Sequence, residues 1–174
     1  MIFTPAFTSV AYTDEYQAAL VADELKRRGY HTIGWIASGA MPHKFVARII
    51  VLGKASNGLI DGFESMKEAQ AHTLRLLKPG ASCADIAASH DDYMRGRALP
   101  PELRLYCHGQ GYDLVERPLV RCDETMTIAE HMNLAVHPGY ETPSIFAVIC
   151  DNYLIESEGP GACLHKTPKQ VFEV

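Results

Sequence analysis

Helical and strand patterns occupy separate parts of this sequence, and that separation constrains the fold more than any other feature. A long amphipathic stretch over 58–77 is followed by Pro79-Gly80, where proline lacks a backbone donor and glycine suits the left-handed exit of a helix. A second helical stretch covers 84–97, and after it the chain carries short strand-like runs separated by glycine and proline. Two helices followed by a series of antiparallel-looking strands predict an α+β fold rather than a doubly wound sheet.

The N-terminal part predicts one more helix and a hairpin. Apolar residues recur at helical spacing over 14–28, and Gly29 ends that stretch. Two apolar runs, 32–37 and 45–52, are separated by turn residues and therefore predict a pair of strands. The strands expected after the second helix are 103–107, 134–136, 144–150 and 153–156.

Size, charge and cysteine content exclude several classes of protein. A chain of 174 residues fits one domain, and a net charge of -5 gives no electrostatic reason to expect nucleic acid or an anionic membrane as a partner. No stretch approaches the roughly 18 apolar residues that span a bilayer, and residues 1–10 lack the basic region of a signal peptide. The cysteines are odd in number and form no CxxC pair. We therefore expect a soluble, cytoplasmic protein.

Five short motifs follow one another along the chain. They are ARIIVLG at 47–53, LKPG at 77–80 with DI at 85–86, CHGQGYDLVERP at 107–118, HMNLAVHPG at 131–139 and CDNYLIESEGPGACL at 150–164. In this order they resemble the catalytic half of the methionine aminopeptidase, Xaa-Pro aminopeptidase and creatinase superfamily. The resemblance implies the pita-bread fold, with helices packed on a curved, mainly antiparallel sheet. It also implies that residues 1–174 form a single domain that lacks part of the usual N-terminal half.

The resemblance further implies a peptidase-like hydrolase, but the metal-binding residues of the superfamily are mostly replaced. Its enzymes activate water with two metal ions held by two Asp, one His and two Glu. The ligand His corresponds to His108, and the two Glu positions hold His137 and Cys150. The two Asp positions hold Phe45 and a residue near Gly34. Because Phe and Gly offer no oxygen ligand, we do not expect the usual dinuclear mechanism.

A first interpretation keeps catalysis without a metal, as in the creatinases of this superfamily. The resemblance then implies that His108 acts as acid/base, since the reference pKa of His, near 6.5, lies close to neutrality. Glu116 or Glu130 would orient a cationic group of the substrate, and Tyr112 would be a further substrate contact. Such an enzyme would cleave a small amide or another C–N bond in a small molecule or a peptide.

Two alternatives stay open. His108, His137 and Cys150 are residue types that bind zinc, so they would hold one Zn²⁺, with or without His43. The other alternative is a catalytically inactive module of the same fold that binds peptides. The resemblance allows a homodimer, which no residue pattern demonstrates. His90, on the second long helix, is expected at a solvated position.

Overall fold

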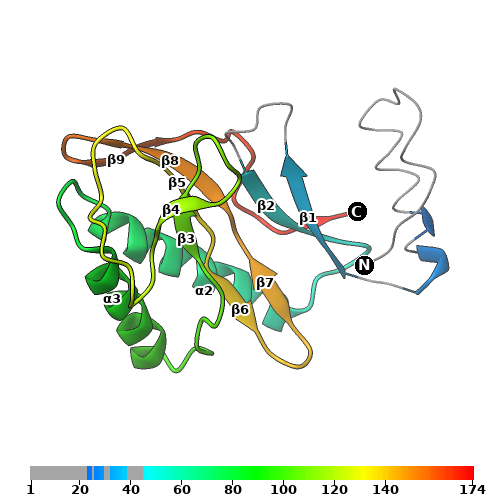
Figure 1. The fold of residues 1–174 in the computed structure, drawn as a ribbon. Helices are drawn as coiled ribbons and strands as arrows, with labels where there is room; N and C mark the ends of the chain where they lie inside the picture. The colour runs from blue at the N-terminus through cyan, green and yellow to red at the C-terminus, as the bar shows by residue number, and fades with distance from the viewer. Residues whose placement is uncertain (1–22, 25, 30–31, 39–44) are drawn as a thin grey trace.

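The computed structural model describes residues 23–24, 26–29, 32–38 and 45–174, and Figure 1 shows the arrangement of its helices and strands. Within these residues the sheets have the strand orders β1-β2-β10, β4-β3-β5-β8-β9 and β6-β7. The elements are β1 (Thr32–Ser38), β2 (Phe45–Val51), α2 (Asn57–Leu76), α3 (Cys83–Gly96), β3 (Cys107–Gly109), β4 (Glu116–Leu119), β5 (Asn133–Val136), β6 (Gly139–Glu141), β7 (Phe146–Val148), β8 (Asp151–Glu156), β9 (Gly159–Cys163) and β10 (Phe172–Glu173). The predicted α+β class is confirmed.

Both long helices lie where the sequence predicts them, because local capping fixes their ends. The Ser56 side chain accepts the Leu59 N–H before α2, and the Ser82 side chain accepts the Asp85 N–H before α3. After α2 the chain leaves through Gly80, whose φ of +86° suits glycine. No helix of the described part combines the length and the apolar character that crossing a bilayer requires.

The predicted hairpin is confirmed as the antiparallel pair β1–β2, with a register that runs from Thr32↔Val51 to Ser38↔Phe45. The end of the chain returns to this hairpin, since β10 pairs with β2 in parallel. Most of the helix predicted over 14–28 lies outside the described residues, and residues 23–24 and 26–27 are helical.

The other strand predictions were correct only in part. Strands over 134–136 and 153–156 are confirmed within β5 and β8, and the run over 144–150 contains the shorter β7. The strand predicted over 103–107 was wrong except at its last residue, where β3 begins. In the preceding segment the Arg104 N–H donates to the Glu102 carboxylate instead of to a neighbouring strand. The strands β4, β6, β9 and β10 were not predicted.

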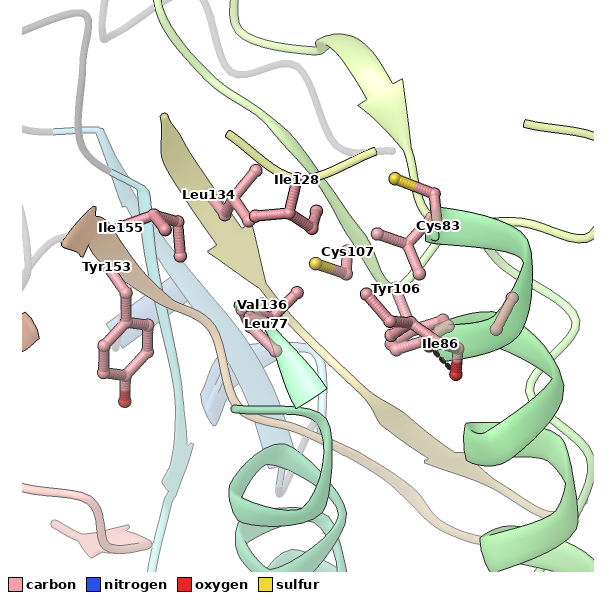
Figure 2. Close-up of a cluster of buried hydrophobic side chains, with 12 residues drawn as sticks. Leu77, Cys83, Ile86, Tyr106, Cys107, Ile128, Leu134, Val136, Tyr153 and Ile155 are labelled. Atoms are coloured by element: carbon pink, nitrogen blue, oxygen red, sulfur yellow. Dashed lines mark hydrogen bonds between the residues drawn. The ribbon is translucent and has the colours of Figure 1, made fainter. Parts of the chain in front are cut away.

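The main core lies between the two helices and one face of the five-stranded sheet. Figure 2 shows side chains of β3, β5 and β8 gathered with side chains at the ends of the helices. Cys107 of β3 and Val136 of β5 are paired residues that both point into this core. Because side chains alternate along a strand, the next residues, His108 and Ala135, point to the opposite face of the sheet.

His90 corrects one expectation from the sequence. It was predicted at a solvated position, but it is fully buried, and its ring stacks on Tyr106 with centroids 3.8 Å apart. Its Nδ1 lies 3.2 Å from the Thr73 hydroxyl of α2. The face of α3 that carries His90 therefore packs toward α2 and β3, and polar spacing along the helix did not indicate this.

A buried ion pair joins β2 to β8. An Nη2–Oδ1 distance of 2.6 Å connects Arg48 and Asp151, and their side chains are 3% and 0% exposed. The guanidinium also donates to the carbonyl groups of Thr167 and Pro168. Because every charged atom of this arginine has a partner, it is tolerated in the interior.

Candidate functional site

The face of the sheet that points away from the helices carries the motif histidine. The strand register aligns His108, Ala135 and Asn152 across β3, β5 and β8. We call this side, defined by these three residues and His137, the histidine face. Next to it lies a cluster of small buried side chains made of Ala47, Ala135, Val148 and Cys150.

His108 and His137 lie together on this face. Their ring centroids are 5.0 Å apart and the rings meet edge to face. The Nδ1 of His108 is 2.8 Å from the carbonyl oxygen of Gly109. A carbonyl oxygen can only accept, so Nδ1 carries the ring proton and Nε2 of the neutral ring carries the lone pair.

Both imidazoles are held in the neutral form. Burial lowers the pKa of His108 below its usual value. Burial, with smaller effects of His108 and the Arg104 cation, lowers the pKa of His137 to about 3. At pH 7 the two rings therefore do not repel each other, and Nε2 of His108 is able to take up a proton.

The predicted substrate contacts are exposed or are engaged within the turn between β3 and β4. Tyr112 is 94% exposed, and Glu130 is also exposed. The carboxylate of Glu116 accepts the backbone N–H groups of Tyr112 and Asp113, at 3.1 Å each, and so holds the turn between β3 and β4. The structure thus brings His108 and His137 together, whereas the Glu116 carboxylate is engaged in its own loop. A role of these three residues in substrate binding stays a prediction.

Comparison with known proteins places the chain in a family. The family model of metallopeptidase family M24 matches residues 13–157. The chain belongs to metallopeptidase family M24. No curated protein matches the sequence significantly.

Solved structures confirm the pita-bread fold of this M24 chain. The X-Pro aminopeptidase of Thermotoga maritima superposes with a TM-score of 0.70 at 18% identity, over 82% of this chain and 40% of that chain. The prolidase of Pyrococcus furiosus gives 0.67 at 23% identity, over 79% and 41%. The N-terminal domain of FACT complex subunit SPT16 from chickpea, Cicer arietinum, gives 0.62 at 16% identity, over 74% and 34%. The chain thus spans about two-fifths of the length of the two enzymes.

The residues that the resemblance assigns to the M24 metal positions include few that could hold a dinuclear centre. Gly34 and Phe45 have no donor atom in their side chains. Cys150 is fully buried, and burial raises the pKa of its thiol far above the usual value. In the part of the chain that the structure describes, no three His, Cys, Asp or Glu residues are grouped as a metal site. The zinc set of His108, His137 and Cys150 stays a prediction, and His43 lies outside the described residues.

Sequence reasoning missed a group of amide side chains on the histidine face. Gln110 is 1% exposed, Asn152 is fully buried, and the Asn152 Nδ2 donates to Gln110 Oε1 at 2.8 Å. Asn133, opposite on β5, accepts a hydrogen bond from the same Asn152 nitrogen. The signal in the sequence was only that Gln110 follows His108 by two residues, which places both side chains on one face of a strand.

The first glycine of the motif, Gly109, allows β3 and β4 to approach closely. A Cβ at this position would lie 2.7 Å from the carbonyl oxygen of Arg117, a backbone atom that cannot move freely. We expect Gly109→Ala to lower the free energy of unfolding by about 1–3 kcal/mol, measured by urea denaturation. Gly96→Ala is the matched control, since a Cβ there meets nothing within 4 Å. Equal stability of the two variants would contradict the prediction.

Proposed function

We propose that this M24 chain binds a small amide or peptide on the histidine face and cleaves a C–N bond without the dinuclear metal centre of the family. His108 is the acid/base of this reaction. The observation that carries the proposal is the 2.8 Å contact from His108 Nδ1 to the Gly109 carbonyl, which leaves Nε2 as the basic nitrogen. The replaced M24 metal positions support a route that does not depend on two metal ions.

Hydrolysis would require His108 to move one proton in two steps. Nε2 first takes a proton from water while the water oxygen forms a bond to the amide carbon. The protonated ring then gives that proton to the nitrogen as the C–N bond breaks. The lowered pKa of His108 favours the neutral ring that the first step needs.

The test is a panel of proline dipeptides, creatine-like compounds and small amides. We expect His108→Ala to reduce any turnover by about 10²- to 10⁴-fold, and removal of metal with EDTA to leave turnover unchanged. His72→Gln is the control, because His72 lies on α2 and contacts Ser89 of α3. Turnover that survives His108→Ala, or that requires a stoichiometric Zn²⁺, would overturn the proposal.

A second candidate function is binding without turnover. The carboxylates of the M24 metal positions are absent, and Glu116, the nearest acidic residue of the motif, is engaged by backbone N–H groups. One protein with this fold, the chickpea relative, is described as a subunit of a complex. Saturable binding of a peptide with no cleavage of any compound in the panel would favour this candidate over the first.

A further inference from the structure

Gln110 lies beside His108 on the histidine face. The backbone N–H of Gln110 donates to the backbone carbonyl of Asn133 at 2.9 Å. This bond continues the ladder between β3 and β5 by one residue. Side chains two positions apart on an extended strand share a face, so Gln110 and His108 point the same way, with Cα atoms about 6.6 Å apart. Gln110 is 1% exposed, so it is a buried residue of this face and not a surface residue.

The orientation of the Gln110 amide follows from a chain of hydrogen bonds. The chain starts at the backbone carbonyl of Gln110, which can only accept, and Asn133 Nδ2 donates to it at 2.7 Å. The other atom of that amide, Asn133 Oδ1, is therefore the acceptor for Asn152 Nδ2 at 3.1 Å. The same Asn152 nitrogen lies 2.8 Å from the Gln110 side chain, whose facing atom must be its oxygen Oε1. His165 agrees with this assignment, since its Nε2 lies 3.2 Å from the remaining Asn152 oxygen.

This chain of bonds leaves the Gln110 nitrogen as a donor without an acceptor. Gln110 Nε2 is buried and has no hydrogen-bond partner, a property it shares, among the described residues, only with His90 Nε2. His90 is enclosed between α2, α3 and Tyr106, within the hydrophobic layer. Gln110 instead shares its face with His108. A buried amide N–H is costly unless it is paired, so this donor calls for an acceptor oxygen.

We propose that Gln110 determines the specificity of the histidine face, by donating from Nε2 to the carbonyl oxygen of an uncharged amide or peptide ligand. The inference rests on the proposed function and names the chemical class of its ligand. A cationic ligand such as a guanidinium brings only donors, and it would meet the donor nitrogen of Gln110. The Gln110 amide therefore selects a carbonyl group and rejects a guanidinium.

The experiment adds acetamide or methylguanidinium to the full chain and detects binding by NMR. The signals observed are the side-chain amide of ¹⁵N-labelled glutamine and the His108 ring. We expect acetamide to shift both the Gln110 side-chain amide and the His108 ring, and methylguanidinium to shift neither. Gln110→Glu keeps the acceptor for Asn152 and removes the donor, so it should weaken acetamide binding about tenfold. Gln110→Met removes the donor without adding a charge and should weaken binding equally. Gln170→Glu, at an exposed position, is the control.

The outcomes separate this inference from the proposed function. If acetamide shifts the His108 ring while both Gln110 variants bind it as the wild type does, the role of Gln110 is wrong and the proposed site stands. If acetamide binds through Gln110 but no amide is ever cleaved, the specificity stands and the catalytic proposal fails. If acetamide shifts neither residue, the role of Gln110 is overturned, and the proposed function is then decided separately by the turnover of His108→Ala.

Discussion

Replacing Arg48 by methionine is expected to lower the free energy of unfolding by about 3–5 kcal/mol, since it leaves the Asp151 carboxylate buried without its main cation. Among the described residues, the Asp151 side chain would keep the Gln70 amide at 3.3 Å and the Lys169 ammonium at 3.4 Å. The carbonyl groups of Thr167 and Pro168 would lose their donor as well. Urea denaturation, monitored by circular dichroism, measures this loss in the free energy of unfolding.

A double substitution separates the charge effect from the packing effect. Arg48→Met combined with Asp151→Leu removes both charges, and we expect it to recover a large part of the stability that the single variant loses. Lys54→Met is the control for loss of a cation, because the Lys54–Glu173 pair is exposed at the lysine. A double variant no more stable than Arg48→Met alone would show that the contacts of the arginine, rather than the unpaired carboxylate, account for the loss.

Acidification from pH 6.5 to pH 4.5 is expected to destabilise the fold through its buried histidines. Burial lowers the pKa of His90 to about 4, and the pKa of His137 is about 3. In this pH range the unfolded chain binds protons at both residues and the folded chain does not, so stability rises with pH and is lost as pH falls. Each of the two rings contributes up to about 1.4 kcal/mol per pH unit.

Thermal or urea unfolding at several pH values measures this slope. Glu124 does not contribute to the slope in this range, because its hydrogen bond from Arg117 holds the pKa of its carboxyl well below the usual value. His90→Phe should remove the His90 share of the slope, up to about 1.4 kcal/mol per pH unit, and keep a ring stacked on Tyr106. An unchanged slope in that variant would show that His90 is not the proton acceptor.

The helices could be predicted from the sequence because their ends are encoded locally. Ser56 and Ser82 cap them, and the glycine after α2 supplies the positive φ. Strand ends depend instead on which partner lies alongside. For this reason β9, with its sequence GPGAC, was not predicted, although its pairing with β8 makes it a strand.

The candidate site, like the fold, could be predicted from the sequence only in part. The structure brings His108 and His137 together, since the two motifs that carry them pair as β3 and β5, and their roles stay predictions. Glu116 was chosen for its charge, and the sequence could not show that its carboxylate is used by its own turn. Gln110 was missed because its unpaired nitrogen results from contacts with two distant strands.

The contacts of Arg48 also have a consequence for synthesis on the ribosome. Its hydrogen bonds reach partners 103, 119 and 120 residues later in the chain. The guanidinium in the β1–β2 hairpin therefore cannot be satisfied until residues 167 and 168 have left the exit tunnel. Until then the guanidinium stays in water and cannot take its buried place, while the helices between form from local contacts. Slow translation of the segment up to residue 168 would prolong that exposed interval and favour aggregation of the nascent chain.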